Sequence, residues 1–432
     1  MNIGIDITAL QSPHRMRGIG ATVINFINNI PEDLQRKHKY TLYAKNFSPS
    51  DSSDPTSLLR LDNLDYEIVT SDFYAPVVNV LLGKSKLSRL MSNILKVPAK
   101  TRELRRYARG ETRIDGLNKL DQFIAFDQNL PLPSKKKVPT TLVVYDLIPL
   151  LFEKDYLWSY STARRNHKTR TRSLLIQSER WAYKYKLKMN IKNAKRVIAI
   201  SEHTKQDLLK TFRTQEDKIE VCHLGVSAKN EKLSGDIKEY LATSWGPIQK
   251  ELDLKGVKYL LFIGGADKRR KIEDLVAAFN NLRGRGHSID LVLAGDTMYG
   301  PYEVPSPDLQ EYFTHTSYLS NVHFLGFVEE AQKRWLYQNA LAFVYPSIYE
   351  GFGLPIIESM AHGTPVITYQ NSSIQEVASD KVLYAKNPTD IARSTVSLLE
   401  NWNLRKKLSD EGLEHSRKFS WPKTAVKIIQ EN

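Results

Sequence analysis

Short runs of β-branched and aromatic residues alternate along the chain with longer segments of helical periodicity. Such an alternation is typical of parallel sheets whose strands are joined by crossover helices. We therefore predict two α/β halves. Strands are expected in the first half at residues 2–7, 40–43, 122–126, 141–145, 196–200 and 219–224, and in the second at 258–263, 289–294, 322–325, 341–345 and 365–369.

The 432 residues exceed what one hydrophobic core usually serves, so two domains are expected. Residues 227–256 are polar, and Gly235, Gly246 and Pro247 interrupt any periodicity there. We predict a Rossmann-like N-terminal domain over residues 1–228, a linker over 229–255 and a Rossmann-like C-terminal domain over 256–412. The last segment is amphipathic, and Pro422 suits the first turn of a terminal helix.

The net charge of +14 indicates an anionic partner without identifying it. Residues 76–110 and 161–190 each contain nine Lys or Arg against one acid. No nucleic-acid readout motif accompanies these basic runs, so we expect no nucleic-acid partner. Cys222 is the only cysteine, which excludes an internal disulfide and suits a reducing compartment. The longest apolar stretch, 142–152, contains Asp146 and is too short to cross a bilayer, so a cytoplasmic location is expected.

Two glutamates flank a glycine-containing loop after the predicted strand at 341–345. Glu350 lies in that loop, and Glu358 falls in the first turn of a helix expected to start near Pro355. A helix start with glycines beside it can bind a diphosphate, while carboxylates accept hydrogen bonds from sugar hydroxyls. Alternatively, Glu358 only stabilises the helix dipole. The backbone amides expected to face a ligand are those of Phe352, Gly353 and Leu354.

A run of four cations follows the predicted strand at 258–263 and two glycines. Four consecutive cations there could neutralise the phosphates of a leaving nucleotide. Taken alone, such a run is more often a solvated face, but its position after a strand of the same half favours binding. The four cations are Lys268, Arg269, Arg270 and Lys271.

Together these segments resemble glycosyltransferase family 4, whose members are retaining enzymes with the GT-B fold. The resemblance is carried by residues 346–376 with their Glu-Gly-Phe-Gly-Leu-Pro sequence, and by shorter matches such as Ser420-Trp421. It implies metal-independent transfer of a hexose from a nucleotide-diphosphate sugar to a glycan or lipid-linked acceptor, with no bound cofactor. It also implies two parallel sheets facing across a cleft and a final helix, 413–432, that crosses back to the first domain.

The resemblance assigns roles to the two motifs. Arg270 and Lys271 would hold the phosphates, with Arg269 as an alternative to Arg270, while Glu350 would bind the donor sugar and Glu358 the ribose. The sugar itself is not defined, although mannose and rhamnose donors fit the family.

The first half matches the family less completely. Gly18 and Gly20 resemble its glycine loop near the donor phosphate, although two glycines also suit a tight turn. At Tyr145-Asp146 the family usually has His-Asp, with the histidine facing the transferred sugar. A phenol donates a hydrogen bond but cannot replace a protonated imidazole at neutral pH. An inactive sugar-nucleotide-binding partner is therefore an alternative to the enzyme, and epimerases and phosphorylases share the same fold.

Residues 77–109 mix Leu, Val and Met with cations. Such a segment can lie on an anionic membrane, since each basic residue near that surface adds about 1 kcal/mol. A helix that packs on its own domain with a basic outer face explains the pattern equally well. The membrane interpretation predicts a peripheral protein on the inner face of the membrane.

Overall fold

A computed structural model describes residues 1–12, 15, 18–45, 54–70, 116–133, 137–152, 170–226, 257–295, 312–313 and 316–430. These residues form two compact units, one comprising Met1–Gly225 with Trp421–Asn432 and the other Val226–Ser420. Both units are α/β, and every paired strand within them is parallel. The chain therefore has the two-domain α/β architecture that the alternation of strands and helices predicts.

The first unit contains a seven-stranded sheet in the order β3-β2-β1-β4-β5-β6-β7. Because the order reverses between β1 and β4, the sheet is doubly wound, and β4 is its central strand. The strands are β1 (Asn2–Asp6), β2 (Lys39–Ala44), β3 (Tyr66–Thr70), β4 (Gln122–Ala125), β5 (Thr140–Val144), β6 (Arg196–Ala199) and β7 (Ile219–Val221). The helices are α1 (Gly18–Asn28), α2 (Glu32–Lys37), α4 (Ile148–Leu151), α6 (Arg170–Asn193), α7 (Glu202–Phe212) and α17 (Trp421–Ile429).

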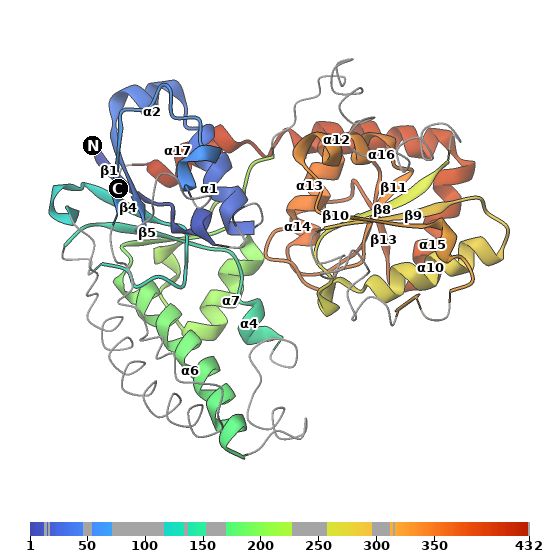
Figure 1. Cartoon of the computed structure of the whole chain (residues 1–432), viewed down its shortest axis with the longest axis horizontal. Helices are drawn as coiled ribbons and strands as arrows, with labels where there is room; N and C mark the ends of the chain where they lie inside the picture. Colours follow the sequence, from blue (N-terminus) through green and yellow to red (C-terminus); the bar gives the residue numbers. More distant parts are fainter. Residues whose placement is uncertain are drawn as a thin grey trace. The chain divides into compact units, whose positions relative to one another are not determined.

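The C-terminal helix α17 packs in this first unit beside α1 (Figure 1). The Arg196 guanidinium donates to the carbonyls of Lys427 at 2.7 Å and Ile428 at 3.3 Å, near the end of the helix. Its other partner is Glu220, at 2.7 Å. Close packing also requires Gly225, since a Cβ there would lie 2.1 Å from the Trp421 nitrogen.

The second unit contains a six-stranded sheet in the order β10-β9-β8-β11-β12-β13. Its strands are β8 (Tyr259–Ile263), β9 (Asp290–Ala294), β10 (Val322–Gly326), β11 (Ala342–Tyr345), β12 (Val366–Tyr369) and β13 (Leu383–Ala385). Its helices are α10 (Ile272–Gly284), α12 (Glu330–Asn339), α13 (Leu354–Ala361), α14 (Ile374–Ala378), α15 (Pro388–Glu400) and α16 (Trp402–Ser416).

Helices cover both faces of this second sheet, with α12 and α16 on one face and α10 and α15 on the other (Figure 1). Residues of its central strands are consequently buried, as Leu260, Phe262 and Phe343 illustrate. The strand order reverses between β8 and β11, so the loops after these two strands lie at the topological switch point. In open α/β sheets ligands bind beyond the carboxyl ends of the strands at this point.

All eleven predicted strands are present, with small differences at their ends. The sequence did not predict β3 and β13, which lie at the edges of the two sheets. The C-terminal segment assigned to the first domain from residue 413 begins instead at Trp421, because residues up to Ser416 continue α16 in the second unit. The expected linker, 229–255, lies outside the described residues.

Candidate functional site

Two loops meet at the switch point of the second sheet. The loop after β8 carries the four cations, and the loop after β11 leads through Glu350 to α13. The Ile348 amide donates to the Arg269 carbonyl at 2.8 Å, which joins the two loops directly. The expected proximity of the cationic turn and the first glutamate is thus present in the fold.

Glu350 is buried, with 8% of its surface exposed, and forms the centre of this cluster. Its Oε1 atom accepts a hydrogen bond from Ser347 Oγ at 2.9 Å and forms an ion pair with Arg269. The Arg270 Nε atom lies 3.7 Å from the same oxygen. Burial alone would raise the pKa of Glu350, but the two arginines and Ser347 together lower it below its ordinary value. Glu350 is therefore a carboxylate at neutral pH, in a fixed orientation.

The two arginines of the turn have different environments. Arg269 is 7% exposed and also donates to the Tyr349 carbonyl at 2.8 Å. Its guanidinium therefore stabilises the loop between β11 and α13. Arg270 donates to the Gly265 carbonyl at 2.9 Å and lies over the Tyr345 ring, 5.8 Å from its centroid. Arg269 is the residue bound to Glu350, which makes it a support for that carboxylate.

Lys271 lies at the start of α10 in a left-handed conformation, with φ of 49°. Its ammonium is 3.0 Å from Glu273 Oε1, and this hydrogen bond raises the pKa of Lys271. About a third of the side chain, 36%, is exposed, so the cation is accessible while Arg269 is not. Lys268, in the same turn, is exposed.

Helix α13 starts at Leu354, with Pro355 in its first turn as predicted. Gly353 precedes it with φ of +97°, a conformation that favours glycine. Phe352 is buried, and its ring lies edge-on to Phe419 with centroids 5.7 Å apart. This packing fixes the loop that carries the helix start.

Glu358 lies in the second turn of α13, not in the first turn as expected, because the helix starts at Leu354. It has protein partners that the sequence did not indicate. Lys333 Nζ on α12 lies 3.1 Å from its Oε1 atom, and the Tyr337 hydroxyl donates to its Oε2 atom at 3.3 Å. Lys333 also forms an ion pair with Glu330 at 2.9 Å. Because Lys333 lies between two carboxylates, its pKa is raised although burial acts in the opposite direction. The ribose-binding role of Glu358 stays a prediction.

The predicted site residues of the first unit lie at the start of α1 and in the segment between β5 and α4. Gly18 begins α1 with φ of +44°, and a Cβ on Gly20 would lie 2.1 Å from the Arg15 carbonyl oxygen. Asp146 Oδ1 accepts from the Ile148 amide at 2.9 Å, which stabilises the turn into α4.

Tyr145 is buried, and its hydroxyl forms no hydrogen bond with the residues that the structure describes. Burial raises the pKa of this hydroxyl well above its ordinary value. The predicted sugar contact at Tyr145 thus concerns a hydroxyl that is enclosed by protein in this structure.

Sequence reasoning did not identify a buried acid in the first unit, Asp6, or its half-buried neighbour Asp127. Thr8 donates to Asp6 Oδ1 from its amide at 2.9 Å and from its hydroxyl at 2.7 Å, and the Asp127 amide donates to Oδ2 at 3.2 Å. Burial, followed by the nearby Asp127 charge, raises the pKa of Asp6 to about 6. The sequence signal that could have identified Asp6 is an acid at the end of an otherwise apolar strand.

Two doubly wound parallel sheets, one with a buried carboxylate and a cationic turn at its switch point, define an α/β protein with the GT-B fold. A model of the glycosyl transferases group 1 matches residues 247–415, and a model of glycosyltransferase family 4 matches residues 16–230. The chain belongs to glycosyltransferase family 4.

Among curated proteins, an uncharacterized glycosyltransferase of Methanocaldococcus jannaschii is 30% identical over 244 residues, covering 54% of this chain and 58% of the relative. The O-antigen chain mannosyltransferase B of Escherichia coli is 27% identical over 247 residues, covering 56% and 61%. The matches thus span less than two thirds of these relatives. Among solved structures, HepE of Anabaena in complex with UDP and glucose has a TM-score of 0.63 at 14% identity, covering 99% of this chain and 98% of that chain.

Proposed function

We propose that the protein transfers a hexose, with retention of configuration, from a nucleotide-diphosphate sugar to a glycan or lipid-linked acceptor in cell-surface polysaccharide synthesis. The observation that carries this proposal is the buried, ionised Glu350 held by Arg269, a residue of the same cationic turn as the accessible Lys271. An oriented carboxylate accepts hydrogen bonds from sugar hydroxyls, and cations at the adjacent helix starts stabilise a departing diphosphate.

In this mechanism the residues of the second unit have separate roles. Lys271 and Arg270 stabilise the negative charge that develops on the diphosphate as the bond to the sugar breaks, and the amides before α13 contribute further donors. Glu350 orients the hexose. The departing phosphate oxygen accepts the proton of the acceptor hydroxyl, and the new glycosidic bond forms on the face from which the diphosphate leaves. Because the cations neutralise the diphosphate, the reaction requires no metal ion.

The comparisons support this class of donor and product. HepE was crystallised with UDP and glucose, and mannosyltransferase B is an O-antigen chain mannosyltransferase. We infer a nucleotide sugar as donor and a surface glycan or its lipid-linked precursor as acceptor for this chain.

Purified protein incubated with UDP, GDP and dTDP sugars and an acceptor extract tests the proposal through the release of nucleoside diphosphate. We expect release with one donor class, and a loss of at least about 100-fold in Lys271→Ala. Lys268→Ala is the matched control, because it removes an exposed cation of the same turn. Equal rates in the two variants would contradict the role of Lys271, and no release with any donor would contradict the enzyme.

A catalytically inactive sugar-nucleotide-binding partner is the alternative, and it is favoured by the enclosed hydroxyl of Tyr145 at the position of the family histidine. Such a protein would bind the donor without turnover. A nucleotide-induced rise in melting temperature without sustained diphosphate release would support this alternative.

We also propose a peripheral location on the inner face of the membrane, based on the basic, apolar segment at 77–109. This segment lies outside the described residues. None of the helices that the structure describes has the length and apolar character needed to cross a bilayer. Sedimentation with anionic vesicles at low and high salt tests the proposal, and the absence of salt-sensitive binding would contradict it.

A further inference from the structure

The second unit contains a cavity of about 560 Å³ at the amino ends of β8, β11 and β12. Its lining includes residues that immediately precede these strands, such as Lys258, Leu341 and Pro365. Because the strands are parallel, the loops with Glu350 and Lys271 lie at the opposite ends, separated from the cavity by the length of a strand, about 13 Å for four residues. The cavity is therefore distinct from the proposed donor site.

The charges of the lining are all positive. Lys258, Arg405 and Lys406 line the cavity, and no Asp or Glu does so among the described residues. Lys406 forms an ion pair with Asp410 on its own helix. Within the described parts of the chain, the side chains of Lys258 and Arg405 form neither an ion pair nor a hydrogen bond, which leaves two cations without a counter-charge beside the cavity.

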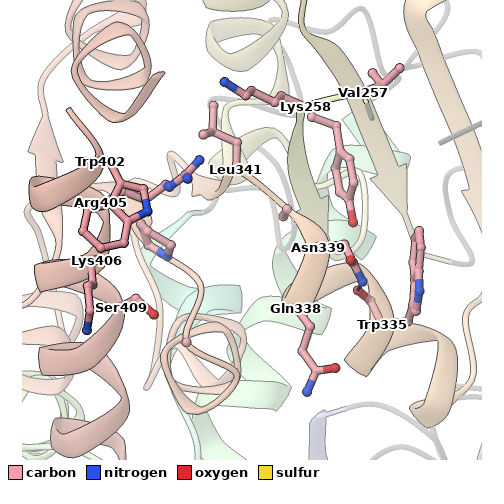
Figure 2. A pocket seen from close by; sticks show the side chains of 14 residues that line it. Val257, Lys258, Trp335, Gln338, Asn339, Leu341, Trp402, Arg405, Lys406 and Ser409 are labelled. Carbon is pink, nitrogen blue, oxygen red and sulfur yellow. Dashed lines mark hydrogen bonds between the residues drawn. The ribbon is translucent and has the colours of Figure 1, made fainter. Parts of the chain in front are cut away.

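These two cations converge from different elements. Figure 2 shows the Lys258 side chain extending from the start of β8 toward the side of the cavity formed by α16, where Arg405 also extends inward. Lys258 is exposed and Arg405 is half-buried, and an anion between their side chains would be attracted by both charges. A phosphate suits this position, since an arginine fork and an ammonium both donate to its oxygens.

The remainder of the cavity is aromatic and polar. Trp402 is the first residue of α16 and is 59% exposed. The Asn401 side chain accepts from the Leu404 amide at 2.9 Å, which fixes the helix start that carries this indole. Gln338, at the end of α12, contributes an amide that can donate to or accept from a ligand. An exposed indole beside two cations offers a flat apolar surface for a ring attached to the phosphate.

We propose that this cavity binds a small organic phosphate ester, with its phosphate between Lys258 and Arg405 and its ring against Trp402. The volume lies within the range of sites for small molecules, about 300 to 1,000 Å³. A sugar phosphate and a nucleoside monophosphate both have this chemistry. The site is independent of the transfer reaction proposed for the opposite ends of the strands.

Calorimetric titration of the full chain with glucose 1-phosphate and with uridine 5′-monophosphate tests the proposal. We expect at least one ester to bind, and Lys258→Ala and Arg405→Ala each to weaken its affinity by about tenfold or more. Lys407→Ala is the matched control, because this exposed cation of the same helix does not line the cavity. The affinity of this variant for the ester should differ from that of the unaltered protein by less than about twofold. If only one of the two esters depends on Arg405 for binding, that result shows whether the ligand is a sugar phosphate or a nucleoside monophosphate.

Two further measurements separate this site from the donor site and from general ion binding. Binding at the cavity should persist in Lys271→Ala, and glucose and uridine without phosphate should bind at least about tenfold more weakly. Ligand-dependent quenching of tryptophan fluorescence should decrease in Trp402→Phe, and any remaining quenching would come from Trp335, which also lines the cavity. The proposal is overturned if neither ester binds at millimolar concentration, or if the Lys258 and Arg405 variants bind as tightly as the unaltered protein.

Discussion

Replacing Arg269 by alanine should destabilise the second unit by about 3 kcal/mol at neutral pH. Both members of the Arg269–Glu350 pair are largely buried, with side-chain exposures of 7% and 10%. Removing one partner of a buried pair costs about 3–5 kcal/mol, because a charge is left without compensation. We place the cost at the lower end because Arg270 stays 3.7 Å from the carboxylate and Ser347 still donates to it.

The pH dependence supplies a second test of the same pair. Since the folded pKa of Glu350 is lowered, its charge contributes stability above the ordinary glutamate pKa, about 4.3, and this contribution is lost as pH falls through the folded pKa. The substitution removes the largest charge that lowers this pKa. The difference in stability between Arg269→Ala and the unaltered protein should therefore be largest at neutral pH and should shrink below about pH 4.

Urea unfolding at pH 7 and pH 3 measures these differences. Glu350→Gln combined with Arg269→Met is the informative double variant, because it removes both charges of the pair while Asp267 stays 3.5 Å from Arg270, so part of the loss should be recovered. The control is Arg393→Ala, which removes an exposed partner of Asp390 and should cost less than about 1 kcal/mol. A loss below about 1 kcal/mol in Arg269→Ala, or no recovery in the double variant, would refute the reasoning.

Three further predictions concern other residues. Glu358→Ala should weaken nucleotide-sugar binding by about tenfold or more through loss of a ribose contact, and unchanged affinity in calorimetry would show that the carboxylate serves only its protein partners. Because the folded pKa of Asp6 is raised to about 6, the first unit should lose stability, on the order of 2 kcal/mol, as pH rises from 4 to 7. Asp6→Asn should abolish that dependence in urea titrations, and an equal slope in the variant would count against the assignment. Gly20→Ala should lower the melting temperature more than Gly18→Ala. A Cβ on Gly20 would lie 2.1 Å from backbone, whereas alanine at Gly18 has space for its Cβ and is strained only by the φ of +44°. The reverse order would contradict this packing argument.

The sequence predicts the elements that are buried on both faces. A strand covered by helices on two sides is mostly apolar, and nine of the eleven predicted strands are interior strands of this kind, which could be recognised from short segments. The start of α13 could likewise be predicted from neighbouring residues alone, since Pro355 fits the first turn of a helix. By contrast, β3 is an edge strand with a mostly exposed sequence, and β13 has only three residues, so neither carries a distinct apolar pattern.

Contacts between distant residues required the folded chain. Because both loops follow strands of the same half, the sequence predicts that Glu350 lies near the cationic turn. Only the packed structure shows that Arg269, 81 positions away, is the cation that forms its ion pair. Similarly, α12 brings Lys333 to Glu358, and nothing in the spacing around Glu358 indicates that cation. The point at which the chain rejoins the first unit, Trp421 and not residue 413, depends on where α16 ends. Periodicity records which faces of an element are buried, whereas the partner of each buried charge is set by elements remote in the sequence.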